Sequence, residues 1–99
     1  MLESLTAENF QPLVGQSFRV RFAEFEVAEL ALVEASAIGA DTDPQRTRTP
    51  FRLLFRGTPG RVAQQATYLI EHETLGEQGI FLVPVSADAD GVYYEAIFN

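Results

Sequence analysis

Apolar and polar side chains alternate with a period of two residues along much of this sequence, and no other feature restricts its fold as strongly. Successive side chains of a β-strand point to opposite faces, so this alternation predicts strands with one buried face. The predicted strands are residues 17–22, 27–35, 51–57, 66–73, 80–85 and 92–98. The second is rich in Ala, Glu and Leu, which favour a helix. We predict a strand there because the alternation continues from the preceding segment.

A short helix is predicted before the first strand. Thr6 is a suitable N-cap, and Leu5 and Phe10 stand at the two positions of a hydrophobic staple. Pro12 and Gly15 limit the helix to one or two turns.

Turn-forming residues separate the strands, notably at 58–60 and 88–91. Six short strands at near-regular spacing predict an all-β protein with one short N-terminal helix. The expected architecture is a single domain over residues 1–99, a six-stranded antiparallel barrel or rolled sandwich, largely a meander. The strand order stays open. Residues 36–50 form a long connection, which is expected to be mobile or functional.

Local irregularities are predicted in two strands. Val33 breaks the alternation of its segment, which suggests a β-bulge near Leu32 or Val33. Pro84 indicates a bulge or a sheet edge. Residues 80–85 are apolar on both faces and are therefore expected to be central or covered. The aromatic residues expected in the core are Phe18, Phe22, Phe51, Phe55, Tyr68, Phe81, Tyr94 and Phe98.

The composition removes several classes of chemistry. The chain has no Lys, no Cys and a single His, so it offers no Schiff-base lysine, no thiolate nucleophile and no two-histidine zinc motif. We therefore predict that it is not an enzyme and uses no cofactor or metal. A net charge of -7 argues against nucleic acid as a partner. No apolar run is long enough for a membrane helix, so no membrane partner is expected.

Two motifs have simpler structural interpretations. His72, beside Glu71, shares a strand face with Tyr68 and Ile70, so we expect a hydrogen-bonded residue at the core rather than a metal ligand or catalytic group. Residues 88–91 resemble part of a calcium loop, but the closing Glu is missing. A hairpin turn in which Gly91 supplies a positive φ is the favoured interpretation.

Arginine side chains are the most informative surface feature. Residues 46–61 contain five Arg and no Asp or Glu. Arg19 and Arg21 share the solvent face of one predicted strand, and Arg52 and Arg56 share that of another. If the two strands are close, these four residues form a patch for an anionic partner. The alternative, which the modest strength of surface ion pairs favours, is cross-strand pairing with Glu residues such as 26, 29 or 95.

The order of motifs resembles a family of uncharacterised bacterial β-rich proteins of about 100 residues. The residues that carry the resemblance are 5–10, 13–15, 55–57, 68–72, 75–76, 81–85 and 94–99. Members of that family are often encoded beside phage-tail-collar or microcystin-dependent-type fibre proteins. The resemblance therefore implies an accessory or assembly role near a tail-like fibre, and it carries no catalytic residue.

Together these observations predict a non-enzymatic structural or interaction module with a protein partner or self-association. The alternative is a small-ligand-binding β-barrel with an aromatic interior, covered by the short helix and residues 36–50. The N-terminus has no basic, apolar leader, so we expect a cytoplasmic protein, with later incorporation into a tail-like assembly.

Overall fold

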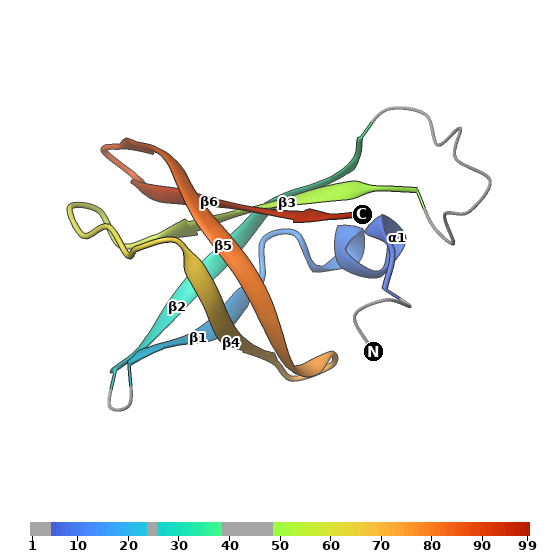
Figure 1. Ribbon diagram of the computed structural model, residues 1–99, viewed down its shortest axis with the longest axis horizontal. Helices are drawn as coiled ribbons and strands as arrows, with labels where there is room; N and C mark the ends of the chain where they lie inside the picture. The colour runs from blue at the N-terminus through green and yellow to red at the C-terminus, as the bar shows by residue number, and fades with distance from the viewer. Residues whose placement is uncertain (1–4, 24–25, 39–48) are drawn as a thin grey trace.

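The computed structural model describes residues 5–23, 26–38 and 49–99, and Figure 1 shows their arrangement. A short α-helix and a 3₁₀ turn precede six strands. The elements are α1 (Ala7–Phe10), η2 (Gln11–Leu13), β1 (Ser17–Ala23), β2 (Glu26–Ala37), β3 (Phe51–Gly57), β4 (Ala66–His72), β5 (Gly76–Asp88) and β6 (Gly91–Phe98). The predicted all-β class and N-terminal helix are therefore confirmed.

The strands close into a barrel in the order β1-β2-β3-β6-β5-β4, with every neighbouring pair antiparallel. This confirms the predicted six-stranded barrel and decides between barrel and sandwich. The barrel consists of two meanders, β1–β3 and β4–β6. They meet at two seams: β3 pairs with β6 along its whole length, 51–57, whereas β1 pairs with β4 only over Arg19–Arg21.

Alternate side chains of each strand fill the barrel. In β3 the buried positions alternate strictly with half-buried ones, as the sequence predicts. Phe18 and Phe55 meet edge to face at a centroid distance of 5.4 Å, and Leu32 and Leu53 have no exposed surface. The middle of the barrel is thus packed with its own side chains, as in other small barrels.

One end of the barrel is closed by α1 and η2, which we call the plug (Figure 1). Thr6 is the N-cap, and its backbone N–H donates to Asn9 Oδ1 at 2.7 Å. Phe10 is buried against Phe51 and Phe98, at centroid distances of 5.8 and 6.1 Å. Among the described residues, no helix has the length and apolar character needed to cross a membrane.

Bulges occur where the sequence predicts them. The register of β2 against β3 shifts between Leu32 and Glu34, which leaves Val33 as the extra residue. The register of β5 against β6 shifts between Pro84 and Ser86. A further shift in β1, between Arg21 and Ala23, was not predicted and sets Phe22 apart at the end of its strand.

The strand at 80–85 differs from the prediction. It extends over 76–88, and its second face is not covered: Phe81 is 52% exposed and Val85 47%. Thr67 pairs with Phe81 and the core-facing partner of Tyr68 is Ile80, so the alternation turns Phe81 outward. The expectation that Phe81 belongs to the core is therefore wrong, because one face of β5 forms part of the barrel's outer surface.

Candidate functional site

Residues 58–65, which we call the strap, connect β3 to β4 across one end of the barrel. In the closed order these two strands stand on opposite sides of the barrel, so their connection has to cross it. Phe51 and Phe98 contact the plug at the other ends of β3 and β6. The strap and the plug therefore cover opposite ends, and we call the strap end the mouth.

Two tyrosine hydroxyls hold the strap in place. The Tyr94 hydroxyl accepts a hydrogen bond from the Ala63 backbone N–H at 2.9 Å and donates to the Arg61 carbonyl at 3.5 Å. The Tyr68 hydroxyl donates to the Gln64 carbonyl. Because a half-buried or buried tyrosine hydroxyl needs a partner, these bonds satisfy both the side chains and the strap backbone.

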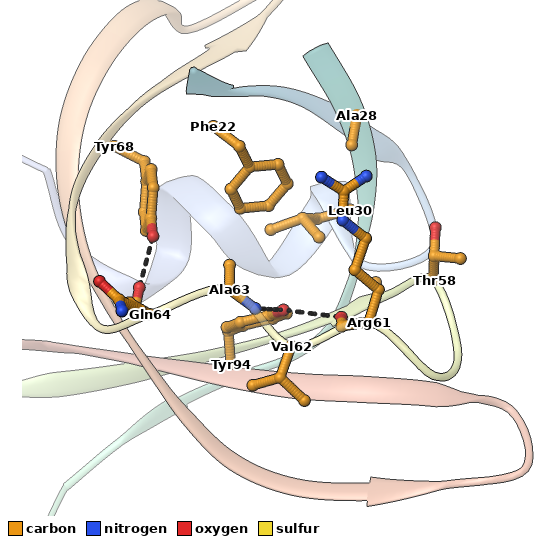
Figure 2. A pocket seen from close by; sticks show the side chains of 11 residues that line it. Phe22, Ala28, Leu30, Thr58, Arg61, Val62, Ala63, Gln64, Tyr68 and Tyr94 are labelled. Carbon is orange, nitrogen blue, oxygen red and sulfur yellow. Dashed lines mark hydrogen bonds between the residues drawn. The ribbon is translucent and has the colours of Figure 1, made fainter. Parts of the chain in front are cut away.

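A cavity of about 330 Å³ lies between the strap and the packed core. Figure 2 shows the rings of Phe22 and Tyr68 near each other, with Tyr94 beneath the strap. Phe22 and Tyr68 meet edge to face at a centroid distance of 5.0 Å. The remaining barrel walls are Ala28, Leu30 and Gly57. Aromatic and aliphatic surface therefore forms the inner side of the cavity.

The strap supplies the polar side chains of this cavity. Thr58, Arg61 and Gln64 line it from the strap, and in Figure 2 the Arg61 side chain extends toward β2. Among the described lining residues there is no carboxylate and no imidazole. The arrangement can bind an apolar group on one side and a polar or anionic group on the other.

The arginines of the predicted patch lie on the outer surface, and β2 separates the two strands that carry them. Arg19 forms an ion pair with Glu71 across the β1–β4 seam. Arg52 contacts Glu95 at 2.6 Å and Glu34 at 2.9 Å. The hydrogen bond from Arg52 to Glu95 is the main cause that raises the pKa of Arg52, and the charge of Glu34 adds to it.

Cross-strand pairing, the favoured alternative to a patch, is therefore present for Arg19 and Arg52, and Glu95 is one of the predicted partners. Arg21 stands opposite both Val27 and Leu69 in the strand register. Of the other two predicted partners, Glu29 stands opposite Arg19 in the register of β1 and β2. The side chain of Glu26 and the two arginines at 46 and 48 lie outside what the structure describes.

Arg56 takes part in a different group, at the β5–β6 turn. Asp88 Oδ1 accepts the backbone N–H of Asp90 at 2.8 Å and that of Gly91 at 3.2 Å, and Asp88 Oδ2 accepts the Tyr93 hydroxyl at 3.0 Å. The Asp90 N–H is the largest cause that lowers the pKa of Asp88, and the Arg56 charge contributes. The hydrogen bond that the Tyr93 hydroxyl donates to Asp88 raises the pKa of Tyr93.

The turn interpretation of residues 88–91 is therefore confirmed, with one correction. Gly91 does not have a positive φ. A Cβ at Gly91 would lie 2.2 Å from the carbonyl oxygen of Gly57, so the glycine is needed for a close backbone approach. In the described part of the chain, no three Asp, Glu or His side chains gather to hold a metal ion.

His72 has the hydrogen-bonded position expected for it. Its side chain is 5% exposed, and its ring lies 4.6 Å from that of Phe18. Nδ1 accepts the Thr74 backbone N–H at 3.1 Å, so Nε2 carries the proton and donates to Gln16 Oε1 at 2.7 Å. Glu71 is on the outer face with Arg19, so the two residues point to opposite sides of the strand.

The mouth site was only partly visible in the sequence. The predicted turn at 58–60 begins the strap, and Phe22, Tyr68 and Tyr94 were expected to be ordinary core residues. The predicted lid differs too: the helix packs at the opposite end against Phe51 and Phe98, and residues 39–48 of the predicted loop lie outside the described chain. The sequence signal for this site was the pair Tyr68 and Tyr94. Both occupy inward-facing strand positions, where a tyrosine hydroxyl requires a hydrogen-bond partner.

Comparison with known proteins gives a family and no characterised relative. A family model described as a domain of unknown function (DUF6916) matches residues 5–98. No curated protein matches the chain, and no solved structure does.

Proposed function

Since this chain belongs to the DUF6916 family, a domain of unknown function, we propose from its geometry that it is a non-enzymatic binding module that holds a small ligand at the barrel mouth. The observation that carries the proposal is the cavity of about 330 Å³ beneath the strap. Its volume falls in the range of ligand sites, which start at roughly 300 Å³. The match to the family model confirms the uncharacterised family that the sequence resembles, whereas a bacterial origin remains a proposal.

The contrast between the mouth and the rest of the barrel supports this function. Leu32, Leu53 and Phe55 have no exposed surface, so the ligand would occupy the mouth and not the barrel centre. Three aromatic rings offer large apolar faces, while the hydroxyls of Tyr68 and Tyr94 are engaged by the strap. A mostly apolar wall with a few polar groups is typical of small-molecule sites.

The same features favour binding over catalysis. The chain has no Lys and no Cys, and both ring nitrogens of His72 have protein partners. The described cavity lining holds arginine, threonine and glutamine but no acid–base pair of carboxylate and imidazole. We therefore propose a role without chemical turnover or cofactor.

A fluorescent probe tests the proposal. N-phenyl-1-naphthylamine is an uncharged aromatic molecule whose emission rises in apolar surroundings. We expect the wild-type protein to bind it and Ala28→Leu to bind it at least tenfold more weakly, because a leucine at this position fills the cavity. Ala31→Leu is the matched control, since Ala31 is on the outer face of the same strand. Equal binding by both folded variants would overturn the proposal.

A second candidate function, assembly with a protein partner, is favoured by the outer surface. Leu69 of β4 is 44% exposed and pairs with Gly79 of β5. Phe81, two residues after Gly79 on β5, is the diagonal neighbour of Leu69. Val27 of β2 is also exposed and pairs with Arg21 of β1. We call Val27, Leu69 and Phe81 the apolar row. Leu69 and Phe81 lie on the adjacent strands β4 and β5, whereas Arg21 of β1 stands between Leu69 and Val27. Exposed apolar side chains that gather on one face are typical of interaction surfaces.

We propose that the partner at the apolar row is a fibre protein of a tail-like assembly, as the resemblance described for the sequence implies. In the closed barrel every strand is paired with a neighbour on both of its sides over at least part of its length. We therefore expect the contact on the outer face and not at a strand edge. We expect an identified fibre protein to co-purify with wild type from the native host and to be lost with Leu69→Ser/Phe81→Ser. Retention by this folded variant, or recovery of no fibre protein, would overturn the assembly role.

A further inference from the structure

We propose that the ligand of the mouth is a compact aromatic molecule, and that Phe22 selects its ring over a saturated ring of the same size. This inference rests on the proposed ligand-binding function. It names the chemical class of the ligand and assigns a specificity-determining role to one residue of the barrel wall.

The depth of the cavity limits the ligand to a compact molecule. Leu30 lines the cavity, and on its plug side the side chains of Leu32, Leu53 and Phe55 have no exposed surface. A long acyl chain would need a channel through the barrel centre, which these side chains fill. The cavity volume of about 330 Å³ lies at the lower end of the range for ligand sites, roughly 300–1,000 Å³. A molecule of one or two rings fits these limits, whereas a lipid chain does not.

Ring packing, and not strand pairing, positions Phe22. The shift in β1 leaves Phe22 without a partner in the register with β2, and the pairing of β1 with β4 ends at Arg21. The Phe22 ring instead meets the ring of Tyr68, on β4, at a centroid distance of 5.0 Å and an interplanar angle of 73°. Both rings line the cavity, as Figure 2 shows. A ligand in the cavity can therefore contact an aromatic pair that is already assembled.

An aromatic ligand can continue the arrangement of this pair. The faces of aromatic rings are negative and their edges positive, so rings attract one another in edge-to-face and offset contacts. The hydroxyls of Tyr68 and Tyr94 are bonded to the strap backbone, so both residues offer ring surface, and little side-chain entropy is lost when a ligand binds. A saturated ring buries apolar surface against the same walls but lacks the attraction between edge and face.

A matched pair of alcohols isolates the aromatic contact. Benzyl alcohol and cyclohexylmethanol differ only in whether the six-membered ring is aromatic or saturated, and displacement of N-phenyl-1-naphthylamine measures the affinity of each. We expect wild type to bind benzyl alcohol about fivefold more tightly. Burial of apolar surface alone would favour cyclohexylmethanol, which has the larger apolar surface. Phe22→Leu keeps an apolar side chain without a ring and should remove most of the preference. Phe81→Leu, the same change on the outer face, is the control and should retain it.

The outcomes separate this inference from the function on which it rests. Equal or tighter binding of cyclohexylmethanol by wild type, or failure of both alcohols to displace the fluorescent probe, overturns the aromatic class and leaves the proposed function standing. This comparison requires no variant. A preference that Phe22→Leu retains overturns the role of Phe22, and one that Phe81→Leu loses places the alcohols on the outer surface and overturns the inference. Failure of the fluorescent probe to bind overturns the proposed function as well. Circular dichroism of each variant verifies that it is folded.

Discussion

Gly57 and Gly91 lie together where β3 ends and β6 begins, and neither has room for a side chain. A Cβ at Gly57 would come 2.7 Å from Leu30 Cδ2, and one at Gly91 would meet the Gly57 carbonyl oxygen. Neither glycine has a positive φ. Gly91 allows the close approach of two backbones beside the mouth, and Gly57 leaves room for the side chains of Leu30 and Tyr94. A sequence pattern of turn residues does not distinguish either role from a requirement for backbone freedom.

Substitution of Gly91 by alanine tests this close approach. Because the obstructing atom is a backbone oxygen and not a flexible side chain, we expect Gly91→Ala to lower the free energy of unfolding by about 2–4 kcal/mol. Gly79→Ala is the matched control: its Cβ would lie 3.4 Å from Thr67 Cγ2, an ordinary contact, so its effect should stay within about 1 kcal/mol. Urea denaturation measures both. Similar values for the two variants would contradict the explanation.

From the shifted pKa values of Asp88 and Tyr93 we expect the stability of the fold to depend on pH in both the acidic and the alkaline range. The pKa of Asp88 is lowered, so its contribution to stability is present above the ordinary Asp value and is lost as the pH falls through the folded-state pKa. The pKa of Tyr93 is raised, so its contribution is present below the ordinary Tyr value and is lost as the pH rises through the folded-state pKa.

Asp88→Asn removes the charge of Asp88 and keeps the hydrogen bonds that form the turn. The amide oxygen can still accept the backbone N–H groups of Asp90 and Gly91, whereas the negative charge near Tyr93 is gone. We expect the pKa of Tyr93 to fall toward its ordinary value, followed by NMR titration of the tyrosine ring carbons. An unchanged Tyr93 titration would show that Asp88 is not the cause.

At the scale of elements, the plug is small but deeply buried. Phe10 is 1% exposed and contacts Phe51 and Phe98, which stack at 4.6 Å. We expect Phe10→Ala to lower the free energy of unfolding by about 3–5 kcal/mol, the range for a buried phenylalanine. Glu8→Ala, on an exposed position of the same helix, should change it by less than about 1 kcal/mol. Thermal and urea denaturation provide the values; a loss below 1 kcal/mol for Phe10→Ala would show that the plug is dispensable.

The elements themselves were largely predictable because their signals are local. Alternation located all six strands, and the irregular positions Val33 and Pro84 located two bulges. Phe81 was misassigned because residues 80–85 are apolar on both faces, and sequence alone does not tell a covered face from an exposed one. The bulge at Phe22 gave no signal, since it falls at the end of an otherwise regular pattern.

At the scale of the whole molecule, the barrel class was predictable, whereas the strand order and the site were not. The turn at 58–60 has the same composition as a hairpin turn, but it leads from β3 to a strand on the opposite side of the barrel. That path depends on which strands pair at long range. The cavity joins the ends of β1, β2, β3, β4 and β6 with the strap, so its walls become neighbours only after the barrel has closed.

The unequal seams predict where the barrel opens first. The β1–β4 seam pairs only over Arg19–Arg21, whereas the β3–β6 seam pairs along the whole of β3. We expect amide protons that bridge β1 and β4 to exchange through a partial opening, at a lower free energy than those between β3 and β6. Native-state hydrogen exchange at increasing denaturant, read by NMR, measures both. Equal free energies at the two seams would mean that the barrel opens as one unit.

The strap has a consequence beyond the ligand site, because it is the only covalent link between the two meanders. Every other contact between β1–β3 and β4–β6 is non-covalent and can be supplied equally well by a second molecule. If the strap straightens, two copies can exchange halves and form a domain-swapped dimer with two complete barrels. Tyr68 and Tyr94, which fasten the strap, belong to the second meander. A ligand that bridges the strap to Phe22 and Leu30 of the first meander therefore favours the monomer.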